Sequence, residues 1–124
     1  MLIKDLRHCR YFTVGDGTRI CEFLHPARDG LELSYSLAHA VLGPGCQSLS
    51  HRLIESSEVY FILEGDGEIQ IDEEQAQVGP GQLVLIPPGS WQSIRNTGTV
   101  DLKFLCIVSP MWRHEDEEVR SDRE

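Results

Sequence analysis

Residues that favour turns recur along this chain at short, nearly even intervals, and this spacing strongly limits the possible fold. Groups rich in glycine, proline and aspartate separate short segments that are rich in β-branched, aromatic and aliphatic residues. Short apolar segments spaced about 8–12 residues apart predict an antiparallel sandwich or barrel rather than alternating strands and helices. We therefore predict an all-β chain with turns at residues 15–17, 29–30, 43–45, 65–67, 72–74, 79–81, 87–89 and 97–98.

Several of these segments alternate along the chain, as strands with two different faces do. In residues 31–41, His39 shares one face with four apolar side chains. In residues 58–64, one face carries Glu58, Tyr60 and Ile62. Arg52 is flanked by His51 and Leu53, so we expect it on the opposite face from them, in a surface or interface ion pair.

The last apolar segment, residues 100–108, is apolar on both faces except at Asp101 and Lys103. Such a strand is buried on both sides, and a homodimer is one way to cover the second side. No helix is expected before Pro110. Residues 110–124 form an acidic C-terminal tail, for which we expect a frayed helix or a solvated segment.

The length of 124 residues and the net charge of −9 limit the organisation of the chain and its partners. The length fits one domain with a single core. The negative charge, without a basic cluster, argues against nucleic acid or an anionic membrane as a partner. No segment approaches the ~20 apolar residues of a membrane span, and the first residues do not resemble a signal peptide. A cytoplasmic location is therefore the default expectation.

The cysteines Cys9, Cys21, Cys46 and Cys106 include no C-x-x-C pair, so neither a zinc knuckle nor a thioredoxin motif is present. In a reducing compartment we expect all of them to be free thiols.

Two longer patterns in the middle of the chain are more specific than the turn spacing. Residues 45–65 read G-x5-H-x-L-x4-E-x6-G, and residues 81–96 read G-x5-P-x-G-x2-Q-x3-N. They resemble the two signature motifs of the cupin superfamily, G-x5-H-x-H-x3,4-E-x6-G and G-x5-P-x-G-x2-H-x3-N. Every fixed position matches except two, where Leu53 and Gln92 stand in place of histidine.

This resemblance implies a fold and an assembly. Cupins are jelly-roll barrels, also described as a double-stranded β-helix. We expect residues 1–124 to form one such domain, with its barrel core at about 18–109. The chain is most similar to small single-domain cupins called mannose-6-phosphate isomerase-like. That similarity implies a likeness in fold and a homodimer, and it implies little about a substrate.

Metal-binding cupins hold one ion with the histidines and glutamate of the two motifs. The resemblance carries over at His51 and Glu58, whereas Leu53 cannot coordinate an ion and Gln92 offers only an amide oxygen. His39 would add an imidazole if its face points into the barrel; the alternative is a hydrogen-bonded histidine of the core or an interface. We predict a divalent transition metal (Fe, Mn, Ni, Cu or Zn) held by His51, Glu58, Gln92 and His39.

The predicted function is that of a metal-dependent enzyme on a small molecule, such as a dioxygenase, isomerase or lyase. The alternative is a metal-free cupin that binds or senses a small molecule. In that case Glu58, beside His51 in an apolar lumen, would have a perturbed pKa and serve as a catalytic general base. A structural or protein-interaction barrel is the third hypothesis. The ligand pocket is expected to be lined by Leu53, Tyr60, Ile62, Trp91 and Phe104.

Overall fold

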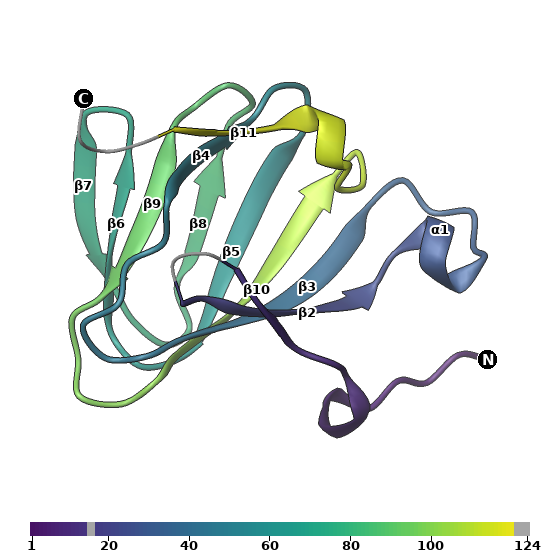
Figure 1. Ribbon diagram of the computed structural model, residues 1–124, viewed down its shortest axis with the longest axis horizontal. Helices are drawn as coiled ribbons and strands as arrows, with labels where there is room; N and C mark the ends of the chain where they lie inside the picture. The colour runs from purple at the N-terminus through teal and green to yellow at the C-terminus, as the bar shows by residue number, and fades with distance from the viewer. Residues whose placement is uncertain (15–16, 121–124) are drawn as a thin grey trace.

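The computed structural model describes residues 1–14 and 17–120 and confirms an all-β chain of two antiparallel sheets (Figure 1). The larger sheet has the order β1-β2-β3-β10-β5-β8, with bounds Phe12–Thr13, Arg19–Leu24, Ser36–Leu42, Leu102–Ser109, Ser57–Glu64 and Leu83–Ile86. The smaller sheet has the order β11-β4-β9-β6-β7, with bounds Glu117–Arg120, Ser50–Leu53, Gln92–Asn96, Gly67–Ile71 and Glu74–Val78. The turn predicted at residues 15–17 falls partly outside the described residues.

Short helical segments interrupt the strands, which corrects the expectation that none precedes Pro110. They are a 3-10 turn at Leu6–His8, the helix α1 at Pro26–Asp29 and a 3-10 turn at His114–Asp116. In α1, the His25 side chain accepts a hydrogen bond from a backbone N–H, and Gly30 ends the helix in the left-handed conformation. So short a helix has no hydrophobic period to detect. Within the described ranges no helix is long and apolar enough to cross a membrane.

Strand β10 is paired on one side with β3 and on the other with β5. Its buried residues alternate, and Leu102, Phe104, Cys106 and Val108 face the interior. On β5 the same alternation turns Glu58, Tyr60 and Ile62 inward. The rings of Tyr60 and Phe104 lie 4.7 Å apart in a tilted arrangement, so they form part of the apolar interior between the two sheets.

The turn after β5 needs glycine at position 65. Gly65 has φ of +86°, and a Cβ atom there would lie 2.6 Å from the carbonyl oxygen of Asp101. Only glycine combines this backbone conformation with so close a contact. The contact places the end of β5 against the start of β10, and the register of the pairing then shifts between Lys103 and Phe104.

The C-terminal segment is part of the barrel, so the expectation of a frayed helix or solvated tail is wrong for residues 110–120. Strand β11 pairs with β4, with Val119 opposite His51. The preceding carboxylate, Asp116, is 3% exposed and accepts hydrogen bonds from the backbone N–H groups of Glu55 and Ser56. These bonds tie the segment to the β4–β5 turn. Residues 121–124 lie outside the described residues.

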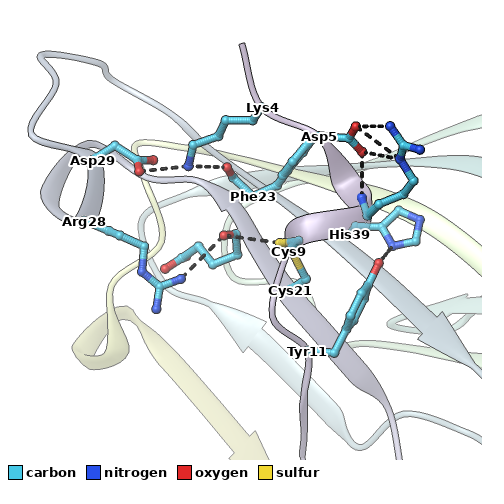
Figure 2. Close-up of a disulfide and its surroundings, with 11 residues drawn as sticks. Lys4, Asp5, Cys9, Tyr11, Cys21, Phe23, Arg28, Asp29 and His39 are labelled. Atoms are coloured by element: carbon cyan, nitrogen blue, oxygen red, sulfur yellow. Dashed lines mark hydrogen bonds and ion pairs between the residues drawn. A yellow bond between two sulfur atoms is a disulfide. The ribbon is translucent and has the colours of Figure 1, made fainter. Parts of the chain in front are cut away.

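Two of the cysteines are paired, which corrects the expectation of free thiols. Cys9 and Cys21 form a disulfide that joins the N-terminal segment to β2 (Figure 2). The same segment is held by the Lys4 ammonium, which lies 2.8 Å from the Asp29 carboxylate and 2.9 Å from the Phe23 carbonyl oxygen. The free thiols are those of Cys46 and Cys106.

The outer face of the larger sheet is apolar over several strands. Leu83 lies opposite Phe61, and Phe61 lies opposite Leu105, so these side chains form a row across β8, β5 and β10. Leu85 belongs to the next row, and Leu83 and Leu85 are each 61% exposed. An apolar patch of this kind marks a contact surface on most proteins.

The disulfide gives the first testable prediction. Denatured, unreduced protein should react with two equivalents of a thiol reagent per chain, and reduced protein with four. The Cys9→Ser variant should unfold with a free energy lower by about 3 kcal/mol, because the link closes a 12-residue separation in the unfolded chain. Cys46→Ser, at an unpaired position, is the control. Four reactive thiols in unreduced protein would contradict the pairing.

We propose that a second copy of the chain covers this outer face, as expected for a homodimer. Light scattering during gel filtration should give twice the 14.0 kDa mass of one chain. Leu83→Lys combined with Leu85→Lys should shift the mass to that of a monomer without loss of the fold, because both side chains are already exposed. The control is Val100→Lys, which alters a side chain that is 60% exposed and outside this face. A monomeric wild-type protein refutes the proposal.

Candidate functional site

An apolar cavity of about 370 Å³ lies between the two sheets. Residues of both sheets line it, together with residues from the two ends of the chain: Phe12 and Val14 before β2, and Trp112, Glu117 and Val119 at the C-terminus. Its volume is at the small end of the range for ligand pockets. The barrel lumen therefore has room for a small organic molecule.

The structure brings most of the predicted pocket residues to this cavity. Leu53, Tyr60 and Phe104 line it, as do His51 and Glu58. These positions follow from the inward faces of β4, β5 and β10.

Two predicted pocket residues lie elsewhere. Ile62 is fully buried in the apolar core and is not part of the cavity wall. Trp91 does not stand at the mouth of the cavity. Its ring lies between the guanidinium groups of Arg52 and Arg120, at 4.7 and 4.2 Å from the ring centre. Arg52 also pairs with Glu118 at 2.7 Å, as expected for a side chain on the outer face of β4.

Glu58 is the most perturbed acid of the site. Its side chain is 8% exposed, and its Oε1 atom accepts a hydrogen bond of 3.0 Å from the amide Nε2 of Gln92. Burial raises the pKa of Glu58 to about 7, against the opposing effects of the His51 ring and the Gln92 bond, and the negative charge of Glu117 adds to the rise. Glu58 therefore has both protonation states available near neutral pH.

Gln92 is the buried partner of Glu58 and is only 1% exposed. Its amide oxygen Oε1 has no hydrogen-bond partner among the described residues. Buried amides are almost always satisfied at both ends, so this unpaired oxygen is unusual. Gln92 is not among the residues that line the cavity, and it acts on the site through its bond to Glu58.

His51 lies on β4 at the cavity wall. Its Nδ1 atom lies 3.0 Å from the carbonyl oxygen of Leu49. Because a carbonyl only accepts, Nδ1 carries the proton in this bond, and the neutral ring then has its lone pair on Nε2. His51 can thus accept a hydrogen bond from a ligand through Nε2.

Sequence reasoning missed Glu117. This residue of β11 lines the cavity, and its Oε1 atom accepts a hydrogen bond of 2.7 Å from the indole Nε1 of Trp112. The acidic run around it resembles a solvated tail. The available signal was the alternation in residues 117–120, where Glu117 and Val119 face inward and Glu118 faces Arg52.

His39 is not brought to the other predicted ligands. Its neighbours Ala38 and Ala40 line the cavity, so the His39 ring lies on the opposite face of β3. There its Nδ1 atom is 2.7 Å from the Tyr11 hydroxyl (Figure 2). Burial, with the charge of Lys103 as a second cause, lowers the pKa of His39. His39 is therefore a hydrogen-bonded histidine of the core, as in the alternative given from the sequence, and not a ligand in the lumen.

The donor set does not fit a resident transition metal. In the part of the chain that the structure describes, no three His, Cys, Asp or Glu side chains lie close enough together to hold an ion. Leu53 presents an apolar wall where the motif has its second histidine, and the Gln92 amide nitrogen faces Glu58. His51 and Glu58 alone fall short of the three protein ligands that such sites use.

A cupin-domain family model matches residues 38–108, which is more than half of the chain. The chain belongs to the cupin family. It is 41% identical over 105 residues to an uncharacterised protein of Methanocaldococcus jannaschii, covering 84% of this chain and 82% of that protein. It is 31% identical over 71 residues to the oxalate-binding protein of Thermotoga maritima, covering 57% of this chain and 59% of that protein.

Solved structures share the fold at low sequence identity. The crystal structure of a predicted oxalate decarboxylase from Thermotoga maritima superposes with a TM-score of 0.76 at 21% identity, covering 88% of this chain and 99% of that one. The nucleoside dehydratase Pac13 superposes with a TM-score of 0.79 at 15% identity, covering 98% of this chain and 92% of that one. These likenesses place the chain among jelly-roll cupins.

The raised pKa of Glu58 predicts a pH-dependent stability. Because the folded protein binds this proton more tightly than the unfolded chain, stability falls as pH rises from 4.5 to about 7. Relative to Glu58→Gln, the wild type should lose about 3 kcal/mol of unfolding free energy over this range. Denaturant titrations at several pH values measure the difference. Glu64→Gln alters the exposed end of the same strand and keeps Glu58, so it should lose stability with pH as the wild type does. Equal pH dependence in Glu58→Gln and the wild type would contradict the assignment.

Proposed function

We propose that the chain binds a small organic molecule in the barrel lumen without a resident transition metal, and that Glu58 exchanges protons with this molecule. The observation that carries the proposal is the buried Glu58, which lines the cavity of about 370 Å³ and accepts a hydrogen bond from Gln92. A carboxyl group in such a setting is costly for stability, and groups of this kind gather at functional sites.

The hydrogen bonds suggest a role for each of the three side chains Gln92, Glu58 and His51. Gln92 holds one carboxyl oxygen of Glu58, so the other oxygen is the atom for proton exchange with a ligand. With a pKa of about 7, Glu58 can take a proton from a bound molecule and return it within one cycle. His51 orients the ligand through Nε2. This arrangement suits a lyase or isomerase reaction in which one proton moves and no electron is transferred.

The relatives support a lumen that serves small molecules. One is named for oxalate binding, and structural neighbours include a predicted oxalate decarboxylase and a nucleoside dehydratase. The first hypothesis from the sequence, a divalent metal enzyme, has less support, because Leu53 and Gln92 occupy positions of metal ligands and His39 faces away. Metal binding is therefore the outcome against which the proposal is tested.

The test is metal content by plasma mass spectrometry, on tag-free protein purified without chelators and again after incubation with each candidate ion. We expect a content far below one ion per chain. In parallel, a compound screen by thermal denaturation should find ligands that add about 2.7 kcal/mol of stability at a hundredfold excess over Kd. About one transition-metal ion per chain, lost in His51→Ala, would refute a metal-independent site.

Two variants that replace an alanine by leucine locate the bound compound. Ala38→Leu fills part of the cavity wall and should abolish the shift in melting temperature. Ala76→Leu makes the same change at an exposed position of β7 and should leave the shift unchanged. If both variants keep the shift in melting temperature, the compound binds outside the lumen.

A further inference from the structure

The charges along the cavity wall are all of one kind. Glu22, Glu58 and Glu117 line the cavity from β2, β5 and β11, and no lysine or arginine of the described chain lines it. His51 is the basic side chain of the wall. Burial is the main cause of the raised pKa of Glu58, the charge of Glu117 adds to it, and the His51 ring acts in the opposite direction. A carboxylate or phosphate ligand would meet repulsion here.

Four aromatic side chains also line the cavity. Phe12, Tyr60, Phe104 and Trp112 line the cavity from different elements. The indole of Trp112 is fixed by its bond to Glu117, and Tyr60 and Phe104 pack on each other. Aromatic faces attract cations through their negative quadrupole, most strongly where water is excluded. Rings from several sides combined with carboxylates are the surroundings that bind ammonium groups.

A third observation concerns the hydrogen bonds that the wall can accept. Gln92 holds one oxygen of the Glu58 carboxyl group, and Glu58 itself lines the cavity. A protonated amine brings donors and no acceptor, which complements a carboxyl group with its other oxygen left for a ligand. The net charge of −9 also raises the concentration of cations near the protein.

We propose that the lumen binds an organic cation, a protonated amine on a small apolar body such as one ring. The proposal rests on the proposed function, since it names the ligand class of that site. It differs from what the names of the oxalate relatives suggest, because oxalate is a dianion and this wall offers it neither a set of three metal ligands nor a lysine or arginine.

The experiment uses three soluble probes with nearly the same shape: benzylamine as the cation, benzyl alcohol as the neutral form and benzoate as the anion. Calorimetric titration of the intact protein should give benzylamine an affinity about tenfold or more above that of benzyl alcohol, with benzoate the weakest. Ala38→Leu should abolish the binding of benzylamine.

A matched pair of variants isolates the charge. Glu117→Gln keeps an acceptor for the Trp112 indole. It should lower the affinity for benzylamine about fivefold or more and leave the affinity for benzyl alcohol unchanged. Glu118→Gln removes one negative charge from the outer face of the same strand. It should change neither the affinity for benzylamine nor that for benzyl alcohol. Unchanged binding of benzyl alcohol also reports that Glu117→Gln is folded.

The outcomes separate the two proposals. The cation assignment is overturned if benzyl alcohol or benzoate binds as tightly as benzylamine. It is also overturned if benzylamine shows no binding up to about 10 mM. Neither result touches metal-independent lumen binding, which falls only if the protein holds a stoichiometric metal ion or if the compound screen finds no lumen ligand. Equal loss of benzylamine affinity in Glu117→Gln and Glu118→Gln would overturn the role of Glu117.

Discussion

The register of β5 and β10 is the constraint on which the rest of the structure depends. Successive side chains of a strand point to opposite faces, so a shift by one residue would exchange every inward side chain for an outward one. In the observed register Glu58 and Tyr60 face the lumen, while Val59 and Phe61 face outward. Gly65 fixes one end of the pairing, because its backbone lies against Asp101, where a side chain would clash, and an irregularity between Lys103 and Phe104 then shifts the pairing into this register.

Two substitutions within an otherwise intact cupin motif change the chemistry of the lumen. Leu53 removes a nitrogen donor and adds apolar surface, and Gln92 replaces a ligand that binds metal with an amide that binds Glu58. The carboxyl group therefore keeps its place in the fold beside a different partner. Burial is the main cause of its raised pKa. The proposed role of Glu58 in proton exchange rests on these two differences.

Features with a local signal were predictable from the sequence. The turns, the alternation of β5 and the spacing of the two motifs identified the all-β jelly roll and brought His51 and Glu58 to one cavity. The features that were missed depend on pairing between distant segments. Cys9 meets Cys21 only because the N-terminal segment lies along β2, and Glu117 reaches the lumen only because β11 pairs with β4. His39 was ambiguous because its strand is buried on both faces, so alternation alone did not tell which face was inside.

The cavity wall has a consequence for how such proteins diverge. The residues matched by the family model run from 38 to 108, yet Phe12, Val14, Trp112, Glu117 and Val119 all lie outside that range and all contact the lumen. Part of the cavity wall thus comes from outside the matched range, whereas His51 and Glu58 come from within it. Exchange of the two ends can alter the charge and shape that a ligand meets while the barrel motifs stay as they are. Relatives aligned only through the barrel can therefore share a fold closely and still select opposite charges.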